Sequence, residues 1–289
     1  MKVSGFTFVR NAIKYDYPVI EAISSMLPLC NEFVVCVGNS DDETLALVES
    51  IASDKIKIVH SVWDDSLREG GRVLAVETDK AFDAVAADSD WAFYIQADEV
   101  VHEQYLPVIK QAMEDHQENK NVEGLLFNYM HFFGSYDYIG TSRLWYRHEI
   151  RVIRNDKSIR SYRDAQGFRK NNKKLNVKPI DAYMYHYGWV RPPKFMQAKV
   201  RNFHSLYHDD QWSEKHLSKS EEFDYSDIDV LARFTATHPT VMRERIERKS
   251  WTFERDLSKN NRKPKEKVLH FIEKLTGKRL FEYQNYKII

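Results

Sequence analysis

The sequence predicts an α/β fold in which a mixed, mostly parallel central sheet carries helices on both faces. Over residues 1–120, apolar runs rich in β-branched and aromatic residues alternate with segments of helical periodicity, and strands that alternate with helices pair in parallel through crossovers. Beyond residue 120, apolar strands follow one another without a regular helix, which indicates an antiparallel elaboration of the sheet. Hydrophobic residues make up 43% of the 289 residues, enough to bury a sizeable core.

The elements of residues 1–120 follow from their local patterns. Alternating or continuous apolar runs predict four strands, at residues 2–10, 33–37, 55–60 and 91–95. Apolar residues at helical spacing predict four helices, at residues 18–27, 41–52, 72–87 and 104–116. Open sheets of this kind bind ligands outside the carboxyl ends of their strands, so functional residues are expected directly after strands.

The later elements divide into strands followed by helices. We expect strands at residues 125–133, 149–154 and 182–189. We expect helices at residues 192–207, 240–255 and 265–275. The prediction is therefore a sheet-containing domain over residues 1–191, followed by a helical C-terminal extension over residues 192–289.

The charges are balanced overall but divided along the chain. There are 43 Lys and Arg residues against 43 Asp and Glu residues, and the pI is about 7.2. Residues 1–150 carry a net charge of −13 and residues 151–289 a net charge of +13. The overall balance, without a recognition motif, argues against a nucleic-acid partner. The two halves suit a cation and an anion respectively, unless their charges only solvate the surface.

The sequence also bears on the cellular compartment. Its longest apolar runs break well before the roughly 18–20 residues that a membrane span needs. The first residues are typical of a strand rather than of a signal peptide. The two cysteines, Cys30 and Cys36, are too few for a disulfide framework. We therefore expect a cytoplasmic protein.

The segment after the fourth predicted strand carries the strongest chemical signal. There an apolar run ends in Gln96-Ala97-Asp98-Glu99. Adjacent carboxylates at the carboxyl end of a strand place hard oxygen ligands where Mg²⁺ or Mn²⁺ can bind together with a nucleotide diphosphate. The alternative interpretation is an acidic turn that opens a helix.

Two further segments accompany this motif. Residues 37–44 read Val-Gly-Asn-Ser-Asp-Asp-Glu-Thr, and residues 185–191 read Tyr-His-Tyr-Gly-Trp-Val-Arg. Together the three segments resemble the DXD-type motif, the Ser-x-Asp-x-Thr turn and the downstream His-Tyr-Gly segment of glycosyltransferase family 2. The resemblance spans residues 3–191 and implies a GT-A type fold, the nucleotide-diphospho-sugar transferase fold. In that fold residues 1–120 would be the nucleotide-binding half and residues 121–191 the acceptor-side half of a catalytic domain.

The resemblance implies residues for a metal and for the donor. Asp98 matches the metal-binding acid, whereas Gln96 replaces the first acid of the motif and is a poor metal ligand. His186 either completes the coordination of a divalent cation, Mn or Mg, or is an ordinary half-buried strand residue. Arg10 and Asn11 match the end of the family's first strand, where the nucleoside base is held, and the three segments add Asn39, Asp42, Gln96, Ala97 and Arg191 as expected donor-binding residues. Separately from the resemblance, Arg72 follows two glycines before a predicted helix and is expected to touch the donor.

The implied reaction is an inverting transfer, in which an acceptor hydroxyl attacks the sugar as the diphosphate leaves. The family's carboxylate base lies downstream of the metal motif. Between residues 150 and 180 only Asp156 and Asp164 are acidic, and we predict Asp164, near the glycine turn at Gly167, as the base. The alternative is that Asp164 neutralises a neighbouring arginine on the surface.

The implied partners are a nucleotide-sugar donor, with a UDP-sugar favoured, and a glycan or lipid-linked acceptor. The basic stretch 151–178 suits an anionic acceptor or peripheral contact with an anionic membrane, although solvation alone also explains it. A non-catalytic carbohydrate- or nucleotide-binding relative is the alternative function, and Gln96 favours it. A nucleotidyltransferase is expected to have a Gly-rich phosphate loop with a lysine near the first strand, and residues 8–11 offer none.

Overall fold

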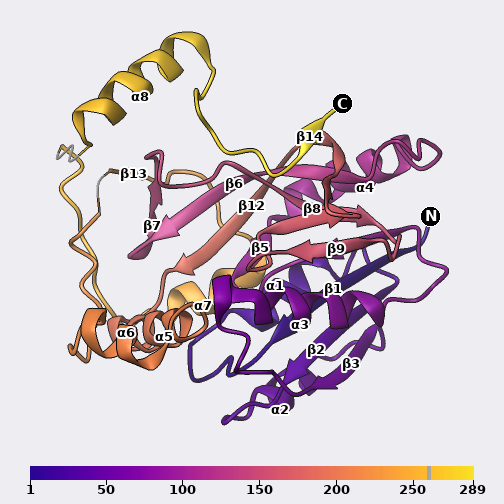
Figure 1. The fold of residues 1–289 in the computed structure, drawn as a ribbon, viewed down its shortest axis with the longest axis horizontal. Helices are drawn as coiled ribbons and strands as arrows, with labels where there is room; N and C mark the ends of the chain where they lie inside the picture. The colour runs from indigo at the N-terminus through magenta and orange to yellow at the C-terminus, as the bar shows by residue number, and fades with distance from the viewer. Residues whose placement is uncertain (229, 259–261) are drawn as a thin grey trace.

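The computed structural model describes residues 1–228, 230–258 and 262–289 (Figure 1). Its parallel half consists of β3 (Ile56–Ser61), β2 (Glu32–Gly38), β1 (Val3–Val9) and β4 (Trp91–Tyr94), which pair in this order. The helices of this half are α1 (Val19–Met26), α2 (Thr44–Glu49), α3 (Arg72–Asp83) and α4 (Leu106–Asp115), with short 3₁₀ turns η1 (Glu69–Gly71) and η2 (Glu103–Tyr105). All eight elements predicted for residues 1–120 are confirmed, with shifted ends.

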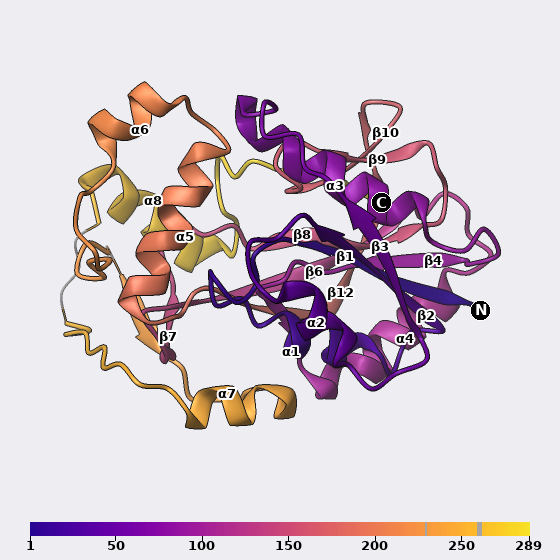
Figure 2. The ribbon, with the colours of Figure 1, turned by 90° about the horizontal axis from the view of Figure 1, so that it is seen from below.

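The helices cover both faces of this sheet because its strands alternate between two cores. In β2, Phe33, Val35 and Val37 face a cluster that includes α1 and α4. Val34 and Cys36 face the opposite cluster, which includes α3. Figure 2 shows α3 on one side of the sheet and α1, α2 and α4 on the other.

The second half continues the sheet with mixed polarity. β8 (His148–Arg154) pairs antiparallel with both β4 and β6 (Gly124–Phe133), and therefore joins the two halves. β12 (Asn176–Trp189) runs parallel to β6 and antiparallel to the short β5 (Glu99–Val101). The predicted mixed sheet with helices on both faces is confirmed.

Smaller elements complete the fold. β7 (Ser135–Gly140) pairs with β6 and β13 (Leu231–Arg233), and β14 (Lys287–Ile288) pairs with β12. A separate three-stranded sheet contains β9 (Ile159–Tyr162), β10 (Gly167–Lys170) and β11 (Lys173–Lys174). The later helices are α5 (Pro193–Ser205), α6 (Asp210–His216), the 3₁₀ turn η3 (Thr240–Met242), α7 (Arg243–Glu247) and α8 (Pro264–Thr276).

The helix predicted at residues 240–255 is wrong beyond Glu247. The chain there leaves the helical path because its aromatic side chains pack on the β6–β7 turn. The indole nitrogen of Trp251 donates a hydrogen bond to the carbonyl oxygen of Gly134 at 2.8 Å. The ring of Phe253 packs edge-on against Phe133 and Tyr138. Tertiary packing therefore outweighs the helical spacing of this segment.

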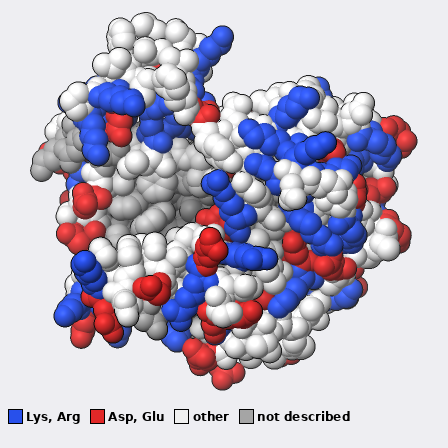
Figure 3. Space-filling view, in the orientation of Figure 1, with Lys and Arg blue, Asp and Glu red and all other residues white. Residues whose placement is uncertain are grey.

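The C-terminal segment is attached to the sheet at several places. β13 and β14 add strands to it, and α5 lies across the carboxyl ends of the first strands (Figure 2). The acidic and basic halves of the sequence interleave as well, because β8 inserts beside β4. Ion pairs such as Arg151–Glu99 and Arg160–Asp83 join the two halves, and Figure 3 shows both signs of charge mixed over one face. Within the described ranges, none of the helices combines the length and apolarity needed to cross a bilayer.

Candidate functional site

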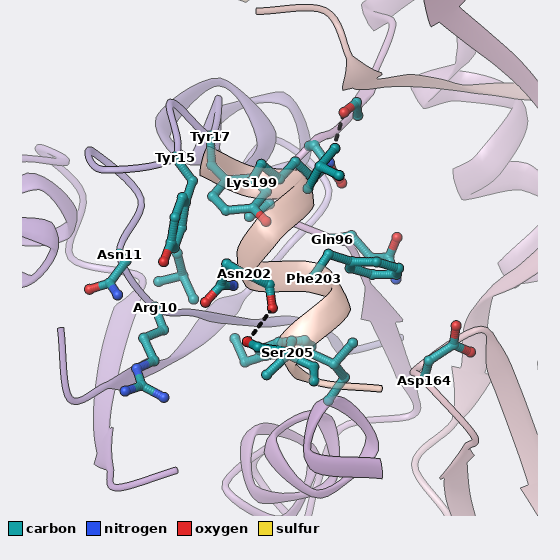
Figure 4. A pocket seen from close by; sticks show the side chains of 18 of the residues that line it. Arg10, Asn11, Tyr15, Tyr17, Gln96, Asp164, Lys199, Asn202, Phe203 and Ser205 are labelled. Carbon is teal, nitrogen blue, oxygen red and sulfur yellow. Dashed lines mark hydrogen bonds and ion pairs between the residues drawn. The ribbon is translucent and has the colours of Figure 1, made fainter. Parts of the chain in front are cut away.

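A cavity of about 790 Å³ lies between the carboxyl ends of β1 and β4 and the helix α5. We call its first side the strand wall, formed by residues that follow β1 and β4: Arg10, Asn11, Gln96, Ala97 and Asp98. We call its second side the helix wall, formed by the β9–β10 turn and α5: Asp164, Met196, Lys199, Val200, Asn202 and Phe203. Figure 4 shows the side chains around α5, with Arg10 and Asn11 to one side and Asp164 to the other.

Asp98 is the buried anion of the strand wall. Its Oδ2 accepts a hydrogen bond from Nζ of Lys199 at 2.9 Å and lies 3.9 Å from a terminal nitrogen of Arg191. Its Oδ1 lies 3.7 Å from Nε2 of His186. Burial by itself raises the pKa of Asp98, but Lys199, His186 and Arg191 outweigh burial and hold this pKa well below its usual range. Asp98 is therefore ionised, with one oxygen bound to a cation and the other facing an imidazole.

The neighbouring carboxylate, Glu99, has a different role. It is fully buried, and Arg151 donates to both of its oxygens, at 2.8 and 2.7 Å. The hydroxyl of Tyr129 and the backbone amide of Gln96 donate to it as well, at 2.7 and 3.1 Å. Such a charge-assisted, two-pronged contact fixes a carboxylate firmly. Glu99 thus anchors the motif to β6 and β8, and Asp98 is the acid that faces the cavity.

His186 approaches Asp98 from β12 and is backed by a second histidine. Its Nδ1 lies 3.0 Å from Nδ1 of His131 on β6, and Nε2 of His131 lies 2.8 Å from the carbonyl oxygen of Tyr146. Burial lowers the pKa of both rings, which favours their neutral forms. Gly188 leaves room for this arrangement, because a Cβ there would lie 2.5 Å from Nε2 of His186.

One end of the cavity combines an aromatic ring with polar side chains. The guanidinium of Arg10 lies 5.4 Å from the ring centre of Trp63 and pairs with Asp65 at 2.6 Å. Asn11 turns the chain out of β1 with a left-handed backbone (φ 57°), a conformation that asparagine tolerates better than most residues. This end of the cavity therefore presents an aromatic ring together with polar groups.

The other end of the cavity presents the carboxylate of Asp164. Its neighbours Arg163 and Ala165 both have left-handed backbones, at φ 57° and 61°, so the turn is held in a costly conformation. The hydroxyl of Tyr207 donates to Oδ2 of Asp164 at 2.5 Å. Gly71 makes this contact possible, because a Cβ there would lie within 2.8 Å of both side chains. Asp164 is thus oriented by a neutral donor.

Four of the predicted donor-binding residues, Asn39, Asp42, Arg72 and Arg191, lie outside the cavity lining. The side chain of Asn39 accepts the backbone amide of Trp63 at 3.0 Å. Asp42 accepts the backbone amides of Lys14 and Thr44 at 2.7 and 3.0 Å. These side chains hold backbone amides of neighbouring segments, at Trp63, Lys14 and Thr44, which is why they do not reach the cavity. Arg72 is exposed at the start of α3.

Arg191, the fourth of these residues, is fully buried and lies behind Asp98 rather than in the cavity. It donates to the backbone carbonyl of Tyr15 at 2.6 Å. Its Nε and its second terminal nitrogen have no hydrogen-bond partner among the described residues. In this position Arg191 stabilises the charge of Asp98, in place of the predicted direct contact with a diphosphate.

The sequence interpretation missed most of the helix wall. It predicted a helix at residues 192–207 but did not identify the face that lines a cavity. The residues at positions 196, 199, 200 and 203 share the spacing of an apolar helix face, and three of them are apolar. Lys199 interrupts that face, and burial together with Arg191 lowers its pKa to about 8. A charged residue within an otherwise apolar helix face is the sequence signal by which Lys199 could have been found.

The residues present fit a divalent cation with few protein ligands. Oδ1 of Asp98 and Nε2 of His186 are 3.7 Å apart, within the ~4.2 Å that two ligands about 2.1 Å from one ion can span. In the described part of the chain, no group of three or more His, Cys, Asp and Glu residues is arranged to hold a metal. The donor set therefore suits Mn²⁺ or Mg²⁺ that binds together with phosphate oxygens and water.

No protein-family model matches the sequence, and no curated protein matches it. Among solved structures, S. aureus TarS is 16% identical with a TM-score of 0.41, over 70% of this chain and 39% of that chain. Residues 1–349 of TarS give 15% identity and a TM-score of 0.40, over 75% and 69% of the two chains. Glucosyl-3-phosphoglycerate synthase from Mycobacterium tuberculosis, crystallised with Mn²⁺, uridine diphosphate and glucosyl-3-phosphoglycerate, is 16% identical with a TM-score of 0.30, over 45% and 44%. These TM-scores lie below one half, so the description of the fold depends on the strand order and pairing given above.

Proposed function

We propose that this protein is a glycosyltransferase that moves a sugar from a nucleotide-diphosphate donor, a UDP-sugar, to a hydroxyl group of a glycan or lipid-linked acceptor. The observation that carries the proposal is a pair of carboxylates, one on each wall, that line one cavity. Asp98 lies among cations at the carboxyl end of β4. Asp164 is held by a neutral hydroxyl across the cavity. Inverting sugar transfer needs this combination of a charge-stabilised leaving group and a separate base.

The strand wall would bind the donor. Its nucleoside fits the end with Arg10, Asn11 and the ring of Trp63, which leaves the diphosphate beside Asp98. Asp98 and His186 would hold Mn²⁺ or Mg²⁺, which supplies positive charge for the leaving diphosphate when it is bound. The ammonium of Lys199 adds a second positive charge at the same place.

The helix wall would activate the acceptor. Asp164 takes the proton of the acceptor hydroxyl as its oxygen forms a bond to the anomeric carbon of the sugar. The bond from that carbon to the diphosphate breaks at the same time, and the diphosphate leaves with the electron pair. Attack opposite to the leaving group inverts the anomeric configuration. The acceptor, the cytoplasmic location and a peripheral contact with an anionic membrane remain part of this proposal, the last supported by the basic residues of segment 151–178.

A second candidate function is a non-catalytic protein that binds a nucleotide sugar or a carbohydrate. Gln96 favours it, because an amide replaces the first acid of the motif and faces the cavity beside Asp98. The Gln96 side chain donates weakly to the carbonyl oxygen of Ala165, at 3.5 Å, and thereby links the two walls. The two candidates differ in whether bound donor is turned over.

The test combines nucleotide binding with donor turnover. We expect uridine diphosphate to bind more tightly with Mn²⁺ than without it, and the UDP-sugar to be hydrolysed slowly even without an acceptor. Asp98→Asn should remove both the metal dependence and the turnover, whereas Asp83→Asn, which changes an exposed carboxylate paired with Arg160, should leave both intact. Binding of the donor without turnover would favour the second candidate. If no nucleoside diphosphate bound, both the glycosyltransferase and the nucleotide-sugar-binding protein would be refuted.

A further inference from the structure

His131 is a buried residue of β6 that the motif resemblance does not include and that does not line the cavity. Its side chain is 3% exposed. The ring stacks against Tyr129 and Trp145, with centroid distances of 5.5 and 5.0 Å, and packs edge-on against Tyr146. This packing holds the ring in one orientation, with its two nitrogens directed at two different partners.

We propose that His131 is a positioning residue, which keeps the Nε2 lone pair of His186 directed at the cation site beside Asp98. The inference rests on the proposed function, because that function supplies the cation. It concerns the hydrogen-bond chain Tyr146–His131–His186, whose two contacts measure 2.8 and 3.0 Å. Partners of this kind, behind a metal-binding histidine, commonly decide which of its nitrogens carries the proton.

The proton positions follow from the carbonyl group at the end of this hydrogen-bond chain. A backbone carbonyl oxygen only accepts hydrogen bonds, so Nε2 of His131 carries a hydrogen and donates to Tyr146. A neutral His131 then has its lone pair on Nδ1. That lone pair accepts from Nδ1 of His186, which therefore carries the second hydrogen. A neutral His186 is left with its lone pair on Nε2, the atom that faces Asp98.

The result is a pair of hydrogen-bond acceptors that face each other at the cavity without a donor between them. Nε2 of His186 lies 3.7 Å from Oδ1 of Asp98, too far for a hydrogen bond. The positive groups Lys199 and Arg191 both contact the other oxygen, Oδ2. Two electron-rich atoms that face each other repel unless a cation binds both. The hydrogen-bond chain thus prepares the gap between His186 and Asp98 for a cation.

The first test reads the proton positions in the unchanged protein. Long-range nitrogen–hydrogen correlation spectra of the histidine rings distinguish a protonated Nδ1 from a protonated Nε2, and the signals lost in His186→Gln assign the ring of His186. Without metal, we expect His186 to carry its proton on Nδ1 and His131 on Nε2. A proton on Nε2 of His186 would overturn the inference, and this measurement needs no active enzyme.

The second test measures Mn²⁺ binding in three variants by electron paramagnetic resonance. His131→Phe keeps the ring stacking but removes the acceptor, and we expect it to weaken Mn²⁺ binding by about 10- to 100-fold. His131→Asn keeps an acceptor oxygen near the position of Nδ1 and should recover most of that affinity. His102→Phe is the matched control, because His102 is also a buried histidine but bonds to Thr237 away from the cavity.

The outcomes separate this inference from the proposed function. Equal Mn²⁺ affinity in His131→Phe and the unchanged protein would overturn the role of His131, while sugar transfer by the unchanged protein would still stand. Equal loss in His131→Phe and His131→Asn would mean that packing alone matters, and would also overturn it. Absence of Mn²⁺ binding by the unchanged protein, with and without uridine diphosphate, would overturn the inference, whereas the proposed function fails only without donor turnover.

Discussion

The two walls of the cavity hold their carboxylates in different surroundings. Asp98 on the strand wall lies against Lys199, Arg191 and His186, and the two cations contact only its Oδ2. Asp164 on the helix wall accepts from the neutral hydroxyl of Tyr207, and no ion pair between described residues involves it. A carboxylate among cations stays ionised and binds charge, whereas Asp164 is oriented by a neutral hydroxyl. The contrast fits the separate roles proposed for the two acids.

The largest effect is expected from Asp164→Asn, which removes the carboxylate of the helix wall. The amide keeps the shape and the contact with Tyr207 but is not a base, so we expect turnover to fall by about 10²- to 10⁴-fold. Donor affinity should stay nearly unchanged, because Asp164 faces the donor site from the opposite wall. Steady-state kinetics together with uridine diphosphate binding measure the two effects separately.

The matched control for that variant is Asp156→Asn, the other acid of the same basic stretch. Asp156 pairs with Lys170 at 3.0 Å and caps the turn at Ser158, outside the cavity. It should leave turnover unchanged. If Asp156→Asn and Asp164→Asn reduced turnover equally, the assignment of the base would be wrong.

The next largest effect is expected from Arg151→Met, which tests what holds the strand wall. Arg151 is 1% exposed, and its loss leaves the carboxylate of Glu99 buried without its countercharge. Breaking a buried pair in this way costs about 3–5 kcal/mol in the free energy of unfolding, which urea denaturation measures. The control Arg160→Met breaks an exposed pair with Asp83 and should cost no more than ~1 kcal/mol. Similar losses of unfolding free energy in Arg151→Met and Arg160→Met would show that burial of an ion pair does not determine how much its loss destabilises the protein.

The contrast between the walls also explains what could be predicted from the sequence. Asp98 and Asn11 each come soon after a strand. The local sequence pattern predicts where a strand ends, and parallel strands end at one edge of the sheet, so both residues could be placed from the sequence. Lys199 reaches the cavity through the docking of α5, and Tyr207, just after that helix, reaches Asp164. His131 meets His186 through the pairing of β6 with β12. Those contacts join positions far apart in the chain, and periodicity carries no information about them. The same reason accounts for Asn39 and Asp42, whose motif matches but whose side chains bond to the backbone of Trp63 and Lys14, far along the chain.

A smaller, pH-dependent effect concerns Glu149, which lies beneath the turn that carries Asp164. Burial raises the pKa of Glu149 from 4.5 to about 8, further raised by Glu99 and opposed by Arg151. Between these two pH values the folded protein binds a proton that the unfolded chain has lost, so stability falls as pH rises, by at most ~1.4 kcal/mol per unit. Glu149→Gln should remove this slope, which urea denaturation over that range measures as a difference from the unchanged protein. If the pH dependence of stability persisted in Glu149→Gln, it would arise from other titratable groups.

The smallest expected effect is that of Tyr207→Phe, and it tests how the helix wall orients its acid. The variant removes one hydrogen bond to Asp164 and keeps the ring, so we expect about a fivefold lower turnover, equivalent to ~1 kcal/mol. Donor binding should not change, because the hydroxyl contacts the base and not the strand wall. In the double variant Asp164→Asn with Tyr207→Phe, the second change should have no further effect, since the hydroxyl acts only through Asp164. If the losses in that cycle were additive, Tyr207 would contact the substrate independently of Asp164. The helix wall would then contribute a second functional group of its own, besides the carboxylate.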